Sequence, residues 1–166
     1  QRDRPAKPIV MMGDLARVQG LVEDLDRSDR KHTYTHVVIR SAYQHGDEHL
    51  KKAIDSFEEH VFAGLETDQF VSGWVKHEDE GQGVHLHGVL PRVELISGID
   101  LNPLPPGWNE GGLVSIWESW WNERHNLARP DDPARLRSTH QTNAEWEERL
   151  KNEDNDFRSE IDHIVE

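Results

Sequence analysis

The segment WVKHEDEGQGVHLHGVL, residues 74–90, decides the fold that the sequence predicts. Two stretches that overlap its ends, residues 69–76 and 84–95, contain β-branched and aromatic residues in the pattern of strands. Between them, residues 79–83 (DEGQG) contain two glycines and form a segment short enough for a tight turn. We therefore expect an antiparallel hairpin.

Three histidines of this hairpin predict a metal site. Side chains two residues apart in a strand point to the same face, so His85 and His87 present two imidazoles together. The hairpin can bring His77 beside them, which gives three ligands and leaves positions open for water or a phosphate oxygen. Asp79 could orient one ligand ring through its second nitrogen. Three ordinary surface histidines are the alternative, and the spacing alone favours neither interpretation.

The chemistry of the donors limits which ion this site would hold. The chain contains no Cys, so any metal must be bound by His and carboxylate side chains. Neutral imidazoles suit Mn²⁺, Zn²⁺, Fe²⁺ or Ni²⁺, and Mg²⁺ can be accepted although it prefers oxygen. We expect Mn²⁺ or Mg²⁺ as the cofactor, with Zn²⁺ or Ni²⁺ able to bind in vitro.

The rest of the chain indicates an α+β fold. Apolar residues at helical spacing predict helices over residues 15–25, 46–63 and 113–125. The β-branched segment TYTHVVIRS, residues 33–41, predicts a further strand, and residues 1–13 are expected to be an irregular lead-in. We expect a central antiparallel sheet with helices packed on one side.

Composition and charge limit the classes of function. The length of 166 residues fits a single domain. The formal net charge of −13 argues against a general nucleic-acid coat protein, which would present a basic surface, so any DNA contact must be local. No run approaches the roughly 18 apolar residues of a membrane helix. We therefore expect no membrane partner, and the cytoplasm is the expected compartment.

Residues 57–93 resemble the mobilisation relaxases, in particular the branch of the colicin-type plasmid mobilisation proteins. That branch carries a Trp-Val-x-His-x-Asp-x-Gly segment followed by a pair of metal ligands and a Pro-Arg-Val strand. Residues 97–103 (SGIDLNP) and 128–135 (ARPDDPAR) also resemble it, so the similarity covers roughly residues 5–137. The matching positions of the first two motifs are Trp74, Val75, His77, Asp79, Gly81, His85, His87, Pro91, Arg92 and Val93.

The resemblance implies a His-hydrophobe-His endonuclease that nicks one DNA strand at a plasmid transfer origin by metal-assisted transesterification. It implies His77, His85 and His87 as metal ligands, although the colicin-plasmid members often carry Glu and Asn at the last two positions. Arg92 is a candidate phosphate contact. The implied partners are single-stranded DNA at the origin, relaxosome accessory proteins and a type IV coupling protein. Residues 1–137 would be the relaxase core, and residues 138–166 a charged helical extension of the same domain.

The nucleophile departs from the pattern of the family. In the family, a tyrosine near the N-terminus attacks the phosphodiester, and it precedes the segment that residues 4–13 resemble. This chain has only Tyr34 and Tyr43, and neither matches that motif. We therefore expect that the natural protein extends before Gln1 and carries its nucleophile there, so that we assign no catalytic residue to this chain.

Three other interpretations remain. A rolling-circle replication initiator shares the fold and the chemistry. A non-catalytic DNA- or metal-binding fragment would lack the nucleophilic tyrosine. A small cupin-like metalloenzyme also places a His-x-His pair on a strand, but it needs more strands and fewer helices than this sequence predicts.

Overall fold

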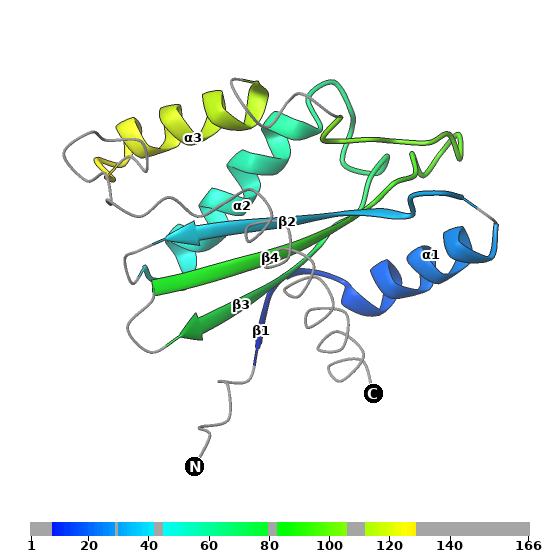
Figure 1. Cartoon of the computed structure of the whole chain (residues 1–166), viewed down its shortest axis with the longest axis horizontal. Coiled ribbons are helices and arrows are strands. Elements are labelled where there is room, and N and C mark those ends of the chain that lie inside the picture. Colours follow the sequence, from blue (N-terminus) through cyan, green and yellow to red (C-terminus); the bar gives the residue numbers. More distant parts are fainter. Residues whose placement is uncertain (1–7, 29, 42–44, 80–82, 106–111, 129–166) are drawn as a thin grey trace, which may run out of the picture.

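The computed structural model describes residues 8–28, 30–41, 45–79, 83–105 and 112–128 (Figure 1). The predicted polar segment beyond residue 128 and the predicted C-terminal helical extension lie outside these residues. The elements follow one another as β1 (Ile9–Gly13), α1 (Leu15–Arg27), β2 (Tyr34–Ser41), α2 (Asp47–Val61), β3 (Gly73–Asp79), β4 (Gly83–Pro91) and α3 (Leu113–Arg124).

The four strands form one antiparallel sheet in the order β1-β3-β4-β2. The predicted hairpin is confirmed as β3 and β4, in which Asp79 pairs with Gly83. The strands are shorter than predicted at the ends away from the turn. At those ends, Leu95 N–H still donates to the carbonyl of Gln69 at 2.8 Å, but both residues lie in loops outside β3 and β4.

The prediction of an irregular lead-in over residues 1–13 is wrong for residues 9–13, which form β1; residues 1–7 lie outside the described part. Strand β1 is short, and it pairs with β3 through Val10–Val75 and Met12–Trp74. The register shifts between Val10 and Met12, and Met11 is buried in the core. Its strand conformation comes from this partner, because five residues carry too little periodicity to predict a strand alone.

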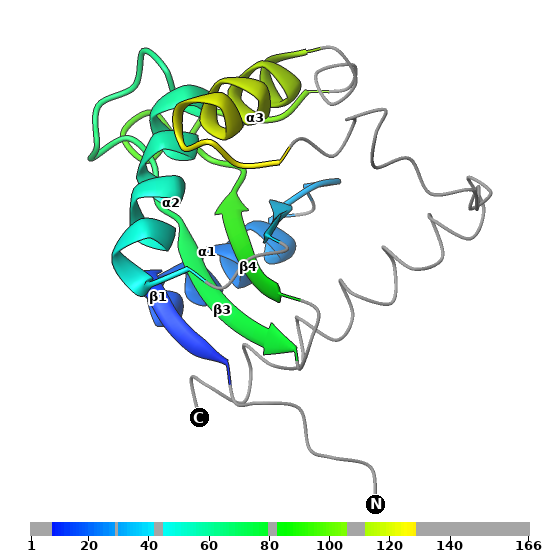
Figure 2. The same cartoon turned by 90° about the vertical axis from the view of Figure 1, so that its left-hand side faces the viewer.

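Helices α2 and α3 cover one face of the sheet, as Figure 2 shows for α2. Phe57 of α2 packs edge-on against Trp74 of β3, with ring centroids 5.8 Å apart, and against Trp117 of α3 at 5.1 Å. Lys76 of β3 is buried on this face and bonds Asp47 at the start of α2, with 2.6 Å between Nζ and Oδ1. The expected antiparallel sheet with packed helices is confirmed.

Helix α1 lies against the other face of the sheet, which differs from the expected one-sided packing. Asp14 caps its N-terminus, because the Asp14 side chain accepts a hydrogen bond from Arg17 N–H at 3.0 Å. Its buried residues Leu15 and Val18 pack against Val75 and Val89 of the sheet. The side chains of these two valines lie on the face opposite the one that α2 covers. The amphipathic pattern of a helix shows that one side is buried, but not which face of the sheet it meets.

The centre of the sheet contains a close approach between an indole and a glycine. Trp74 pairs with Gly88, and a Cβ added at Gly88 would lie 2.6 Å from atoms of the Trp74 ring. The indole N–H donates to Oε1 of Glu58 at 2.6 Å, and the Ser72 hydroxyl donates to the same oxygen. Burial raises the pKa of the Glu58 carboxyl, and these two hydrogen bonds partly offset that effect.

Replacing Gly88 by Ala should destabilise the fold. The added methyl group overlaps the Trp74 ring, which is fully buried, so the ring or the strand must move, at a cost of about 1–3 kcal/mol or more. Urea unfolding measures the change. Gly20→Ala is the matched control: Gly20 lies in α1 with nothing within 4 Å of the added Cβ, so this variant should gain about 0.5–1 kcal/mol. An unchanged midpoint for Gly88→Ala would contradict the packing described.

Candidate functional site

The three predicted histidines lie on one face of the β3–β4 hairpin, opposite the core face that contains Trp74. His77 pairs directly with His85 across the two strands, and His87 follows two residues later on β4. The ring centroids of His77 and His87 are 4.7 Å apart, and those of His85 and His87 are 6.3 Å apart. The structure therefore brings together the three residues that the sequence singled out, and His87 is the common member.

These separations are near those of imidazoles that share one ion. With metal–nitrogen bonds of about 2.0–2.1 Å, two rings on one metal have centroids roughly 5 Å apart. The His77–His87 separation agrees with this value, and the His85–His87 separation is somewhat longer. In the described residues, no three His, Asp or Glu side chains are already set to hold an ion, so binding would require the rings to rotate.

His87 is the most buried of these rings, with 7% of its surface exposed. Burial, with a smaller contribution from the charges of His77, His36, His85 and Arg40, lowers the pKa of His87 to about 3. The ring is therefore neutral at physiological pH. A neutral imidazole keeps one nitrogen lone pair, which is the form that binds a metal.

Two residues of β2 belong to the same face and were not predicted as part of the site. The β2–β4 register pairs Arg40 with His85 and Val38 with His87, so His36 and Arg40 stand beside the histidines. His36 Nε2 lies 3.2 Å from His87 Nδ1, and the two rings stack at 5.4 Å with 19° between their planes. The sequence gives the alternation of β2 but not its neighbour in the sheet, so neither contact could be predicted from it.

Of the other two predicted site residues, Arg92 lies away from this cluster, and the side-chain position of Asp79 is untested. Arg92 follows the far end of β4, where it pairs with Asp100 at 3.2 Å between Nη2 and Oδ2, and its side chain is only 15% exposed. Five residues of extended chain separate it from His87, roughly 16 Å. Asp79 ends β3 opposite Gly83, and its side chain lies outside the described residues.

Tyr34 begins β2 at the end of the sheet away from the histidines. It pairs with Pro91 and packs against the cluster of Leu15, Val18 and Val89. Its ring therefore contributes to packing against α1. Tyr43 lies outside the described residues.

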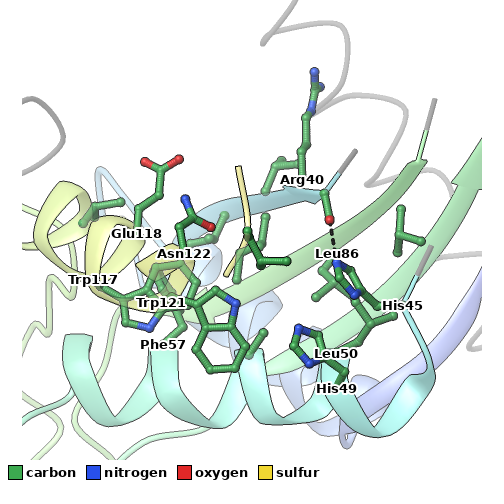
Figure 3. A pocket seen from close by; sticks show the side chains of 18 of the residues that line it. Arg40, His45, His49, Leu50, Phe57, Leu86, Trp117, Glu118, Trp121 and Asn122 are labelled. Carbon is green, nitrogen blue, oxygen red and sulfur yellow. Dashed lines mark hydrogen bonds between the residues drawn. The ribbon is translucent and has the colours of Figure 1, made fainter. Parts of the chain in front are cut away.

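A second group of histidines lies on the other side of β2, at a cavity of about 570 Å³ between β2, α2 and α3 (Figure 3). The His45 and His49 rings stack at 4.4 Å, and the His49 and His125 rings meet edge-on at 4.9 Å. Burial lowers the pKa of His45, and the charges of His49 and His125 add to the effect. The ring centroids of Trp121 and His125 are 3.9 Å apart, so these imidazoles pack together with an aromatic side chain of α3.

Comparisons with known proteins support a relationship to plasmid-encoded relaxases. The chain is 42% identical over 85 residues to cryptic plasmid protein C of Neisseria gonorrhoeae, which covers 51% of this chain and 40% of that protein. It is 31% identical over 88 residues to the DNA relaxase MbeA of Escherichia coli, which covers 53% of this chain and 17% of MbeA. The chain thus matches less than half the length of either relative.

No protein-family model matches the chain, and no solved structure matches it either. Within the described residues, no helix is long and apolar enough to span a membrane.

Proposed function

We propose that this chain is the metal-binding core of a relaxase nuclease domain, which nicks single-stranded DNA at a plasmid transfer origin during mobilisation. The observation that carries the proposal is the group of three imidazoles on one face of β3 and β4. The relative that is named a DNA relaxase supports the same chemistry. The proposed partners are the origin DNA, relaxosome accessory proteins and a type IV coupling protein, and the proposed compartment is the cytoplasm.

The donor set fits a divalent cation of the Mn²⁺ or Mg²⁺ type, with His77, His85 and His87 as its ligands. Their backbone positions are fixed by the β-ladder, and the rings would have to rotate to reach a common ion. When bound, such an ion supplies the positive charge that polarises a scissile phosphate. His87 supplies a neutral nitrogen, and the β3–β4 ladder holds the backbone of all three residues, which would keep the phosphate position fixed for in-line attack.

Arg40 is better placed than Arg92 to contact the phosphate. It is exposed on β2, directly across from His85, and its charge acts on His87. A guanidinium can donate two hydrogen bonds to a phosphate, and Arg92 lies five residues along the chain from His87. We assign the phosphate contact to Arg40.

Ile9 of β1 pairs with Lys76, so β1 lies beside the end of β3 that carries His77. Tyr34, in contrast, packs at the other end.

The second candidate is a non-catalytic DNA- or metal-binding fragment, which is favoured by the placement of Tyr34 away from the histidines. A rolling-circle initiator would use the same site geometry for replication. The experiments below separate binding from catalysis.

Mn²⁺ should bind to the chain at one saturable site, and His77→Ala, His85→Ala or His87→Ala should weaken binding by roughly 100-fold or more, because each removes one ligand nitrogen. Calorimetry at neutral pH measures the affinity. His32→Ala is the matched control, since His32 is exposed outside the cluster, and it should bind like the parent chain. Equal affinity in the parent and all three variants would rule out this site.

Binding of short single-stranded DNA should be weak, with a shallow salt dependence, because the chain has a net charge of −13. Arg40→Gln should lower the affinity and reduce the slope of log K against log salt by about 0.7, the value for one phosphate contact on a single strand. Fluorescence anisotropy at several salt concentrations gives the slope. Arg124→Gln, an exposed change at the end of α3, should leave it unchanged. If the slope of log K against log salt falls only in Arg92→Gln, the phosphate contact belongs to Arg92 and not to Arg40.

The chain of residues 1–166 should form no covalent adduct with labelled origin DNA in the presence of Mn²⁺, because Tyr34 cannot reach a phosphate held at the histidines. A denaturing gel detects the adduct. A shifted band from this chain that disappears in Tyr34→Phe or Tyr43→Phe would make that tyrosine the nucleophile.

A further inference from the structure

The three histidines of the proposed metal site do not account for the cavity between β2, α2 and α3. Its volume of about 570 Å³ lies within the range of roughly 300–1,000 Å³ that small-molecule pockets occupy. Part of its wall is formed by buried rings of α2 and α3, those of Phe57, Trp117 and Trp121, and Leu86 of β4 also lines it. The cavity is therefore large enough for a flat organic group, and its wall offers such a group aromatic and apolar contact.

Two polar side chains of α3 also line this cavity. Figure 3 shows Glu118 and Asn122 on the same side of α3, as expected for residues four positions apart on a helix. The amide of Asn122 can both donate and accept hydrogen bonds, so it can pair with a ring that carries both kinds of group on its edge. The carboxylate of Glu118 repels an anion such as a phosphate. This chemistry favours a neutral ring with a polar edge.

The cavity extends along the edge of β2. Six successive residues, 36–41, line it, although the side chains of a strand alternate between the two faces. A cavity that meets all six must pass around the strand, and β2 stands at one end of the strand order of the described sheet. Among the six, His36 lies beside His87, and Arg40 pairs with His85. The cavity is thus continuous with the face that carries the histidines.

We propose that this cavity receives one base of the single-stranded DNA, turned out of the strand, while a neighbouring phosphate lies at the three histidines. This inference rests on the proposed function, which supplies the DNA. Unstacked bases are commonly held by aromatic side chains and by hydrogen bonds to their edges. Neighbouring strands lie about 4.7–4.9 Å apart, so little more than the width of β2 separates the two positions. A base and a phosphate of the same or adjacent nucleotides can span this separation.

Fluorescence anisotropy with two labelled strands tests the proposal on the whole chain in the presence of Mn²⁺. One strand is a mixed-sequence oligonucleotide of about ten nucleotides, and the other has the same phosphates but an abasic sugar at every position. We expect the strand with bases to bind roughly 5- to 100-fold more tightly, because one base gains the contacts of the cavity. The abasic strand should keep the phosphate contacts alone.

Variants of α3 locate the contact. Val114→Phe should remove most of the difference between the two strands, because Val114 lines the cavity and the added ring occupies it. Asn122→Leu should reduce the difference by removing the hydrogen bonds to the base edge, and it decides the question if Val114→Phe does not fold. Ile116→Phe is the matched control, since Ile116 is 57% exposed and does not line the cavity. It should keep the full difference, and every folded variant should bind the abasic strand like the parent chain.

The outcomes separate this inference from the proposed function. If both strands bind the parent chain equally, the inference fails and the phosphate contact stands. If the difference persists in both Val114→Phe and Asn122→Leu, the bases bind elsewhere and the inference is overturned. If neither strand binds, the proposed DNA contact fails, and NMR of the indole N–H signals with deoxyadenosine decides whether the cavity accepts a base. Shifts of Trp117 and Trp121 would support it, and unchanged signals would overturn it.

Discussion

The packing of Trp74 over Gly88 is the constraint on which the rest of the structure depends. The two residues are paired across β3 and β4, and the indole occupies the space where any other residue at position 88 would place its Cβ. Since strand side chains alternate, a slip of one residue would turn every side chain to the opposite face. The fit of one ring over one glycine therefore fixes the register, and the register places His77 and His85 directly opposite each other on the other face.

The same indole connects the sheet to α2 through a buried carboxyl group. Glu58 accepts hydrogen bonds from Trp74 and Ser72, which satisfy the polar groups that close packing has removed from water. The raised pKa of Glu58 shows the cost of burying it in the charged form. Lys76, buried on the same face, reaches the start of α2 through Asp47. Both contacts attach α2 to β3, so α2 supports the histidine-bearing hairpin on the face opposite the histidines.

The sequence could predict what depends on local periodicity. It gave the hairpin, the strand at β2 and the three helices, and the two-residue spacing correctly placed His85 and His87 on one face. It could not predict β1, whose conformation comes from pairing with β3. Nor could it predict His36 and Arg40 at the site, because the position of β2 beside β4 depends on strand order in the sheet. Arg92 was chosen for its place in a motif, yet distance along β4 separates it from His87.

The electrostatics of the cluster indicate how metal and DNA binding would depend on each other. The chain has a net charge of −13, and His87 is neutral at physiological pH, so this imidazole by itself does little to attract a phosphate. Arg40 brings one positive charge to this face, against a repulsive background that acts over the Debye length of about 8–10 Å. A divalent ion on the three histidines would add two more charges at the point of contact. Under the proposed function, the bound ion would therefore raise the affinity for the strand, and the strand would raise the affinity for the ion by the same factor.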